Sequence, residues 1–318
     1  MSQYCLPLMR AVVTGGAGFI GSHLVDALVG RGEEVVVVDN LATGRRERVN
    51  EGARLEEVDI RDAEALDRVF GDLRPDVCFH LAAQADVRVS VERPAYDADV
   101  NLVGTIRVLE AARRAGTQVV FSSTGGAIYG ECERPAREDD PRAPFSPYGT
   151  SKLAAEEYLA TWNRLYGSRH VALRYGNVYG PRQDPHGEAG VVAIFFGRLA
   201  EGRPVTIFGD GSQTRDYVQV DDVVAATLAA ADHTGGVFNV GTGAETSVLE
   251  LYETCRRVSG VDLEPEFADP RLGELQRSFL DPELAAAKLG FSAQVRLEDG
   301  FARTWRFVTE GETRTGAN

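Results

Sequence analysis

Tyr148 and Lys152 stand four residues apart in the segment SPYGTSK, a spacing of about one helical turn. Both side chains would project from the same face of a helix, where they could meet one substrate. A phenol with a pKa near 10 is a poor base at neutral pH, but a lysine ammonium beside it favours the phenolate. The pair therefore indicates general base chemistry on a hydroxyl group. Because this spacing is common on solvated helices, the prediction depends on the rest of the chain.

A glycine pattern near the N-terminus indicates a cofactor for that chemistry. Gly15, Gly18 and Gly21 lie in TGGAGFIG, directly after the apolar run AVVT. The first glycine suits a tight turn, the second a close backbone approach, and the third close packing of a helix on a strand. The N-terminus of such a helix offers free N–H groups to phosphate charge. The context favours a dinucleotide-binding turn over a plain connection.

Asp39 ends the next valine-rich run, about 20 residues after the glycines. A carboxylate at this offset can accept hydrogen bonds from both hydroxyls of an adenine ribose, and it repels a 2'-phosphate. The position predicts NAD as the cofactor rather than NADP. Arg45 and Arg46 lie nearby and leave NADP open.

Hydroxyl side chains follow the strand expected to begin at Gln118, in the sequence FSST. The ends of such strands line the ligand crevice of a doubly wound sheet. Thr124 could donate a hydrogen bond to a substrate oxygen or to a Tyr148 phenolate. The residues leave open whether Ser123 or Thr124 takes this role.

The elements that must position these side chains alternate between apolar runs and amphipathic stretches. The runs RAVVT, VVVVD and VCFHLA, with helical patterns between them, indicate βαβ units. Val35 to Val38 suits a strand buried on both faces of a parallel sheet. Long helices are expected from about Pro94 to Arg114 and from Ser146 to about Tyr166. The predicted fold is α/β, a Rossmann-like doubly wound parallel sheet with a smaller C-terminal substrate-binding α/β lobe.

The domain boundaries follow a change of composition after Tyr175, where glycine, proline and charged residues become frequent. Residues 10–175 are predicted to form the NAD-binding Rossmann domain, with a return strand near 237–241. Residues 176–309 are predicted to form mainly the substrate domain. Residues 1–9 and 310–318 are expected to be disordered, and translation could start at Met1 or at Met9.

Composition limits the partners. The formal net charge of −14 repels nucleic acid and anionic membrane surfaces, so neither is expected as a partner. The four cysteines are widely scattered, which supports neither a disulfide framework nor a zinc site and fits the cytoplasm. His186 and Glu188 lack a third ligand nearby, so no metal is predicted. No signal peptide or membrane-spanning segment is expected.

The combined segments are similar to the extended short-chain dehydrogenase/reductase family, most closely to bacterial UDP-glucose 4-epimerases. The likeness covers roughly residues 10 to 305. It is carried by TGGAGFIG, Asp39, HLAAQ, the NLVGT run, FSST, SPYGTSK and RYGNVYGPRQ. The resemblance implies a catalytic triad of Thr124, Tyr148 and Lys152, with NAD as the cofactor.

By this resemblance the activity is 4-epimerisation of a UDP-hexose, UDP-glucose or UDP-galactose, through a transient 4-keto sugar. Tyr148 would take the proton of the 4-hydroxyl, Thr124 would orient the 4-oxygen, and Lys152 would hold the nicotinamide ribose and lower the pKa of Tyr148. Dehydratases and decarboxylases of the family carry acidic residues after the Thr124 position. Gly125 and Gly126 stand there, which disfavours those reactions, and they are expected to lengthen a loop.

The resemblance also implies a set of binding residues. The cofactor contacts are Gly15, Gly18, Phe19, Ile20, Gly21, Asp39, Asn40, Asp59, Ile60, Leu81, Ala82, Ala83, Gln84, Asn101, Ser122, Tyr148, Lys152 and Tyr175. The substrate contacts are Arg88, Thr124, Tyr148, Asn177, Val191, Thr206, Ile207, Phe208, Arg215, Tyr217, Arg271 and Ser278. Within the second set, Arg215 and Arg271 would clamp the diphosphate, and Tyr217 would line the uracil pocket.

Several alternatives stay open at this level. Ser278 is small where some relatives carry a bulky residue, which predicts that UDP-N-acetyl sugars are also accepted. Arg88 could instead meet the carboxylate of UDP-glucuronate, which would make the chain a UDP-glucuronate 4-epimerase. A non-catalytic NAD-binding module is a third hypothesis. A homodimer through a four-helix bundle is expected from the resemblance, with the two long helices at the interface, and the pathway implied is nucleotide-sugar and galactose metabolism.

Overall fold

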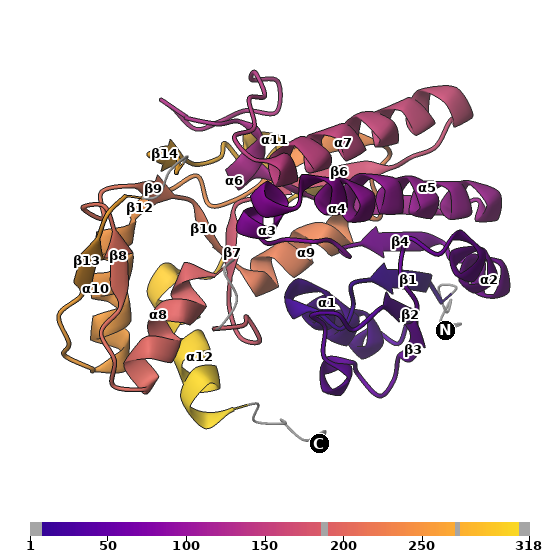
Figure 1. The fold of residues 1–318 in the computed structure, drawn as a ribbon. Helices are drawn as coiled ribbons and strands as arrows, with labels where there is room; N and C mark the ends of the chain where they lie inside the picture. Colours follow the sequence, from indigo (N-terminus) through magenta and orange to yellow (C-terminus); the bar gives the residue numbers. More distant parts are fainter. Residues whose placement is uncertain (1–7, 186–189, 271–273, 312–318) are drawn as a thin grey trace, which may run out of the picture.

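A seven-stranded parallel sheet forms the centre of the larger lobe (Figure 1). The computed structural model describes residues 8–185, 190–270 and 274–311. In spatial order the strands are β11 (Gly236–Val240), β6 (Val171–Tyr175), β5 (Gln118–Thr124), β4 (Val77–His80), β1 (Arg10–Thr14), β2 (Glu34–Asp39) and β3 (Arg54–Glu57). The strand order reverses between β1 and β4, and ligands of such sheets bind beyond the carboxyl ends of the strands at this point. The predicted fold class is confirmed.

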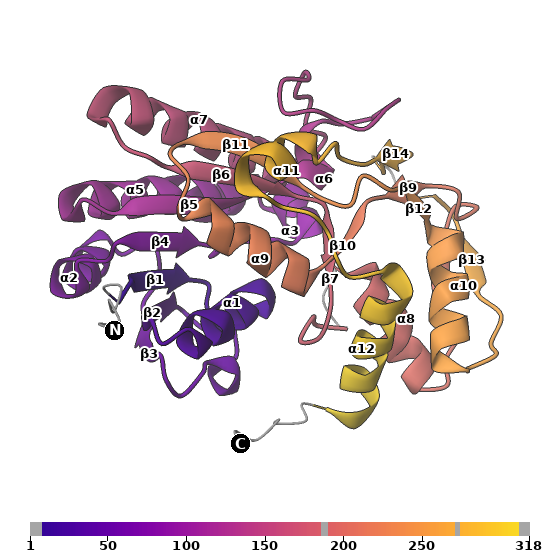
Figure 2. The same ribbon diagram turned by 180° about the vertical axis from the view of Figure 1, so that it is seen from behind.

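Each face of the sheet has its own cover of helices (Figure 2). The helices α1 (Phe19–Gly30), α9 (Val220–Ala230) and α11 (Glu283–Leu289) pack on one face, and α2 (Ala63–Leu73), α5 (Gly104–Ala115) and α7 (Pro147–Tyr166) pack on the other. Strand β2 serves both cores, because Val35 and Val37 face the first set while Val36 and Val38 face the second. The prediction that this run is buried on both faces is confirmed.

The two long helices that the sequence predicts are present, and they lie on the same face of the sheet. Helix α7 begins at Pro147, and the Ser146 side chain accepts a hydrogen bond from the Gly149 N–H as the N-cap. The other helix has an irregularity that the sequence pattern did not predict. After the short α3 (Val87–Glu92), helix α4 (Pro94–Ala98) runs into a π-helical turn at Asp99–Val103 before α5. Such turns re-aim side chains and are frequent at functional sites.

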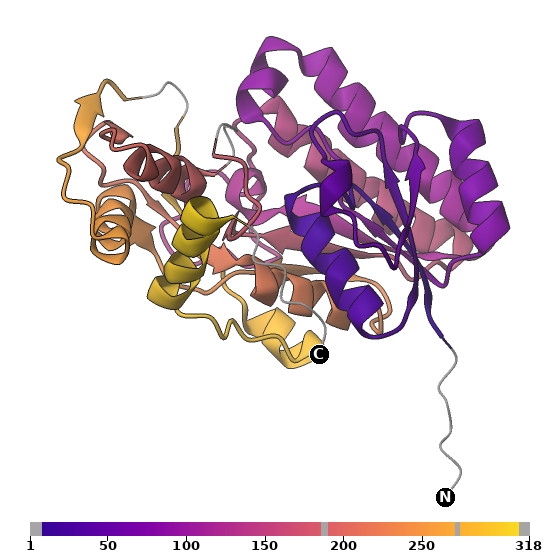
Figure 3. The ribbon, with the colours of Figure 1, turned by 90° about the horizontal axis from the view of Figure 1, so that it is seen from below.

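The smaller lobe has a separate core (Figure 3). Helices α8 (Val191–Ala200), α10 (Val248–Ser259) and α12 (Leu297–Glu310) pack together there. Short strands pair as β7 (Asn177–Tyr179) with β10 (Tyr217–Gln219), as β8 (Thr206–Phe208) with β13 (Glu266–Ala268), and as β9 (Thr214–Arg215) with β12 (Thr246–Ser247) and β14 (Arg277–Ser278). These pairs bring together segments that lie far apart in the sequence, near the carboxyl ends of the strands of the larger sheet.

The chain crosses between the lobes more than once. Strand β11 pairs with β6, and α9 and α11 pack on the large sheet although they come from the second half of the chain. At the C-terminal end, α12 includes Glu310, which we had expected in a disordered tail. At the other end, the prediction of disorder is wrong at Met9, whose N–H donates a hydrogen bond to Glu33. Residues 1–7 and 312–318 lie outside the described residues.

Candidate active site

The glycine turn between β1 and α1 is built as the sequence predicts. Gly15 has φ +72°, in the left-handed region that side chains disfavour. A Cβ on Gly21 would stand 2.1 Å from the Gly15 carbonyl oxygen, so only glycine lets the helix pack this closely. Gly18 is the N-cap of α1, and no side chain caps the first turn. The N–H groups of the first turn of α1 therefore have no side-chain cap as acceptor, which suits an anion site at this helix N-terminus.

Asp39 lies at the carboxyl end of β2, beside the glycine turn. It is buried, and its carboxylate accepts hydrogen bonds from the N–H groups of Ala17, at 3.0 Å, and Leu41, at 2.8 Å. Each carboxylate oxygen retains acceptor capacity for a ribose hydroxyl. Nearby, Arg46 pairs with Glu57, which occupies one of the two arginines that left NADP open.

Other predicted cofactor residues line the same edge of the sheet. The Asn40 side chain donates to Asp59, and the Arg61 guanidinium holds the pKa of the Asp59 carboxyl well below its usual range. Ile60 is buried against the core beside them. These contacts fix the chain that passes over the ends of β2 and β3.

The segment that follows β4 is held in place by hydrogen bonds to Thr14. The Ala82 N–H donates to Thr14 Oγ1, and the Leu81 N–H donates to the Thr14 carbonyl oxygen. His80 lies between Thr14 and Thr105, 2.7 and 2.9 Å from their hydroxyls, and burial lowers the pKa of its imidazole to about 3. The neutral ring therefore bridges the glycine turn and α5.

Gln84 and Asn101 are tied to each other. The Gln84 N–H donates to Asn101 Oδ1 at 2.9 Å, and Asn101 Nδ2 donates back to the Gln84 carbonyl oxygen at 2.8 Å. Asn101 stands in the π-helical turn, so that turn aims the amide at the segment following β4. Ala83 lies between these anchored positions.

Tyr148 and Thr124 meet at the carboxyl edge of the sheet. Thr124 ends β5 and is the N-cap residue of α6 (Gly125–Ile128), while Tyr148 lies in the first turn of α7. Burial and the Asp97 carboxylate raise the pKa of Tyr148 to about 12, and a hydrogen bond with Thr124 opposes them. The expected lowering of this pKa by Lys152 is not seen in the protein alone, because burial dominates.

Lys152 lies one turn farther along α7 and is buried. Its Nζ donates to the Ser122 carbonyl oxygen at 2.8 Å and stands 6.0 Å from the centroid of the Tyr148 ring. Burial lowers the pKa of Lys152 to about 8, although the carboxylates of Asp97 and Glu156 oppose the shift. Tyr148, Lys152 and the end of β5 thus form one cluster.

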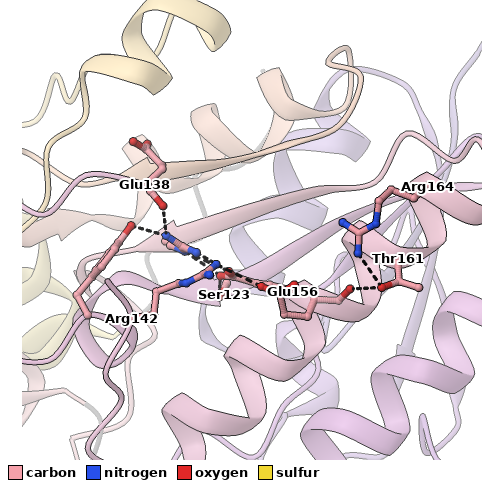
Figure 4. A network of polar contacts seen from close by, with 9 residues as sticks. Ser123, Glu138, Arg142, Glu156, Thr161 and Arg164 are labelled. Atoms are coloured by element: carbon pink, nitrogen blue, oxygen red, sulfur yellow. Dashed lines mark hydrogen bonds and ion pairs between the residues drawn. The ribbon is translucent and has the colours of Figure 1, made fainter. Parts of the chain in front are cut away.

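Ser123 belongs to a buried ionic network that includes Glu156 (Figure 4). Its hydroxyl donates to Glu156 at 2.5 Å. The same carboxylate receives Arg174 of β6 through bonds of 2.7 to 3.2 Å. Arg174 also donates to the Tyr129 hydroxyl and to the Glu138 carbonyl oxygen. The geometry favours Thr124 over Ser123 as the hydroxyl that can reach a substrate.

Gly125 and Gly126 form the first turn of α6, so the prediction that they lengthen a loop is wrong. A Cβ on Gly125 would stand 2.5 Å from Leu280, and one on Gly126 would stand 3.2 Å from Asn177 Oδ1. Larger side chains here would clash with Leu280 and crowd Asn177. The two glycines therefore allow Leu280 and Asn177 to approach the end of β5 closely.

Several predicted substrate residues lie around β7 and β10. Asn177 and Tyr217 are register partners in that pair and line a cavity of about 10 Å³ together with Val191. Gln183 also lines this cavity and was missed by sequence reasoning. Its Oε1 is buried and has no hydrogen-bond partner among the residues that the structure describes. Its place in RYGNVYGPRQ was the available signal.

Arg215 and Ser278 are register partners in β9 and β14. Arg215 forms an ion pair with Glu274 at 3.7 Å, and Ser278 is buried. Thr206, Ile207 and Phe208 form β8, whose central residue is buried in the core of the smaller lobe.

The remaining predicted contacts fall elsewhere. Arg88 is exposed on α3. The Tyr175 hydroxyl lies 2.8 Å from Thr227 Oγ1 of α9. Phe19 and Ile20 open α1, and the Phe19 ring packs edge-on against His23. Arg271, His186 and Glu188 lie outside the described residues.

Two findings bear on other classes of site. Within residues 8–185, 190–270 and 274–311, no group of three or more His, Cys, Asp or Glu side chains could hold a metal ion. Over the same residues, no helix combines the length and the apolar character needed to cross a membrane.

The sequence pattern of the NAD dependent epimerase/dehydratase family matches residues 11–241. The UDP-glucose 4-epimerase of Mycolicibacterium smegmatis is 49% identical to this chain over 307 residues, covering 94% of this chain and 98% of the relative.

Two solved structures resemble the chain over almost its whole length. The UDP-glucose 4-epimerase of Thermotoga maritima, with UDP-glucose, is 48% identical with a TM-score of 0.93, covering 95% of this chain and 99% of the other. The UDP-glucose 4-epimerase of Thermus thermophilus, in complex with NAD, is 48% identical with a TM-score of 0.89, covering 94% of this chain and 99% of the other.

Proposed function

The chain belongs to the NAD dependent epimerase/dehydratase family, and we propose that it catalyses the NAD-dependent 4-epimerisation of UDP-glucose and UDP-galactose. Two relatives at 49% and 46% identity bear the names UDP-glucose 4-epimerase and putative UDP-glucose 4-epimerase. These names do not favour the rival hypotheses of a UDP-glucuronate 4-epimerase or a non-catalytic module. The proposal places the enzyme in galactose metabolism.

The residues present fit NAD. The glycine turn offers uncapped N–H groups at α1, and a Cβ on Gly18 would stand 3.2 Å from the Gly15 carbonyl oxygen. Asp39 would accept the hydroxyls of the adenine ribose, and Lys152 would hold the nicotinamide ribose. The chemistry that NAD supplies when bound is reversible acceptance of a hydride, which epimerisation through a transient 4-keto sugar requires.

The proton steps would belong to Tyr148 and Thr124. Tyr148 would accept the proton of the 4-hydroxyl and return it to the 4-oxygen after the sugar has turned over. Thr124 would donate a hydrogen bond to that oxygen. Gly125 and Gly126 supply no acid or base for elimination, which disfavours dehydration and favours reduction of the keto sugar.

The observation that carries the proposal is the cluster of Thr124, Tyr148 and Lys152 at the carboxyl edge of the sheet. Replacing Tyr148 with Phe should lower kcat by roughly 10²- to 10⁴-fold, because the proton acceptor is lost. Bound NAD, released by denaturation and quantified by absorbance, should stay at the wild-type stoichiometry. An unchanged rate of UDP-galactose conversion in this variant would contradict the mechanism.

We propose that Asn177, Arg215 and Tyr217 bind the UDP portion and that Arg271 adds a second cation to the diphosphate. The buried Ser278 beside Arg215 supports a sugar pocket with room for a 2-acetamido group. UDP-N-acetylgalactosamine should therefore be epimerised as well. Ser278→Tyr should remove that activity and retain conversion of UDP-galactose, and the product epimer ratio measures both.

We further propose a homodimer through α5 and α7. Apolar side chains stay exposed on and beside these helices, with 66% of Leu165, 52% of Tyr166 and 37% of Val103 accessible. Two copies related by a twofold axis would cover them in a four-helix bundle. Light scattering coupled to gel filtration should give twice the chain mass, and Leu165→Glu should lower it. The cytoplasm is the proposed compartment, since Cys78, Cys132 and Cys255 are buried free thiols.

A further inference from the structure

Asp97 is a buried carboxylate beside the proposed active site that no predicted role uses. It lies in α4 with 0% exposure. One carboxylate oxygen accepts hydrogen bonds from Gln84 Nε2 at 3.0 Å and from Asn101 Nδ2 at 2.9 Å. The other accepts from Ser151 Oγ at 2.6 Å. All three donors are uncharged, so they orient the carboxylate without neutralising it.

Lys152 is a buried cation in a similar situation. It is 2% exposed, and its Nζ donates to the Ser122 carbonyl oxygen and stands 4.7 Å from the Phe121 ring centroid. Among the residues that the structure describes, neither Lys152 nor Asp97 has an ion pair within 4.0 Å. Ser151, which is bonded to Asp97, directly precedes Lys152 in α7.

The other ionisable groups around Lys152 leave Asp97 as its counter-charge. On α7, Glu156 is paired with Arg174 of β6 at 2.7 Å, so that carboxylate is already matched. On β4, His80 is neutral because burial lowers the pKa of its imidazole to about 3. Tyr148 is also neutral at pH 7 in the protein alone, since its pKa is raised to about 12.

We infer that Asp97 is a positioning residue that acts as the counter-charge of Lys152, holding the buried ammonium in its protonated form. Its bond to Ser151 fixes the turn of α7 between Tyr148 and Lys152. The catalytic consequence rests on the proposed function, but the charge state of Lys152 does not.

The directions of the pKa shifts agree with this geometry. Burial lowers the pKa of Lys152 to about 8, and the Asp97 carboxylate is the first of two that oppose the shift. The same carboxylate adds to burial in raising the pKa of Tyr148. Removing its charge should therefore lower both pKa values and move the active pH range downwards.

Asp97→Asn tests the inference with little change of shape. The amide oxygen can still accept from Gln84 and Asn101, and the amide nitrogen can donate to Ser151 Oγ. The chain has two lysines, Lys152 and Lys288, so protein labelled with ¹³C at lysine Cε gives two resolvable titrations by NMR. The midpoint of Lys152 should fall by at least about one pH unit. Lys288 is exposed on α11 and should not move.

Three further variants serve as controls for this measurement. Asp86→Asn removes the carboxylate that caps α3 and keeps a good capping residue, so the Lys152 midpoint should stay at the wild-type value. Ser151→Ala keeps the charge of Asp97 and should lower the midpoint less than Asp97→Asn does. Asp97→Ser is a second neutral variant should the amide not fold. An unchanged midpoint in either folded neutral variant would overturn the inference, as would a wild-type midpoint below about 7.

The activity measurement separates this inference from the proposed function. In Asp97→Asn, the pH profile of kcat for UDP-galactose should move to lower pH than in the wild type. Wild-type protein that epimerises no UDP-hexose would remove the proposed function and leave the NMR result standing. If the wild type is active but Asp97→Asn leaves the Lys152 midpoint unchanged, this inference alone would be wrong.

Discussion

Lys152 and Glu156 lie one turn apart on the inner side of α7, and the protein surrounds them differently. Glu156 receives Arg174 and the Ser123 hydroxyl, so its charge is matched at close range. Lys152 touches a carbonyl oxygen and an aromatic ring, and the Asp97 carboxylate contributes most to stabilising its charge. A buried ion pair in direct contact holds elements together, whereas a buried charge without a direct ion-pair partner can respond to a ligand. The comparison separates a structural half of the helix from a reactive half.

The largest expected effect is on the structural half. Arg174→Met leaves the buried Glu156 without a cationic partner and should lower the free energy of unfolding by about 3–5 kcal/mol. Urea denaturation measures this. Arg134 pairs with Asp140 on the surface, and Arg134→Met should cost less than about 1 kcal/mol. Equal losses in the two variants would contradict the distinction.

On the reactive half, Thr124→Ala should change rate and not stability. Loss of the hydroxyl that bonds to Tyr148 should lower kcat by about 10²-fold, as removal of one positioned donor commonly does. The midpoint of urea denaturation should remain near that of the wild type. Steady-state assays with UDP-galactose, together with the bound NAD content, check both statements.

The charge of Lys152, which has no ion pair within 4.0 Å among the described residues, should also appear in the pH dependence of stability. Its pKa is about 8 in the folded protein and near 10.4 when unfolded, so between these values the unfolded chain binds more protons. Stability contributed by this group is therefore lowest below pH 8 and rises up to about pH 10, by on the order of 2 kcal/mol. Lys152→Met should be more stable than the wild type at pH 7, and the gap should close by pH 10. A gap that is constant with pH would refute the assignment.

The smallest effect is expected for Ser123→Ala. Glu156 keeps Arg174, so loss of one donor should cost about 1 kcal/mol, and kcat should change by less than about threefold. This variant is the counterpart of Thr124→Ala. Should Ser123→Ala abolish turnover while Thr124→Ala does not, the reacting hydroxyl belongs to Ser123 and the two halves of the helix overlap.

Local signals in the sequence predicted much of this arrangement. Val35 to Val38 gave a doubly buried strand, Ser146 and Pro147 gave the start of α7, and Gly15 gave a turn with positive φ. These features depend on residues a few positions apart. Such signals act through backbone geometry and periodicity, which a single sequence displays.

Long-range contacts were not predictable in the same way. Asp97 meets Ser151 across 54 positions, and Tyr129 meets Asn239 across 110. No local pattern marks which buried carboxylate faces which donor, since pairing depends on how the sheet and helices pack. The π-helical turn at Asp99–Val103 and the choice between Ser123 and Thr124 are of this kind.

The return of α9 and β11 to the large sheet affects how the chain is made. Val223, Val224 and Leu228 of α9 cover one face of the sheet, and Val240 of β11 adjoins β6. When Tyr175 has just emerged from the ribosome, α9 and β11 have not yet been made. One face of the sheet is then uncovered, and the edge of β6 is unpaired. The first lobe must therefore wait for later segments of the same polypeptide. Folding during synthesis should finish late, and premature termination after β6 should yield a product prone to aggregation.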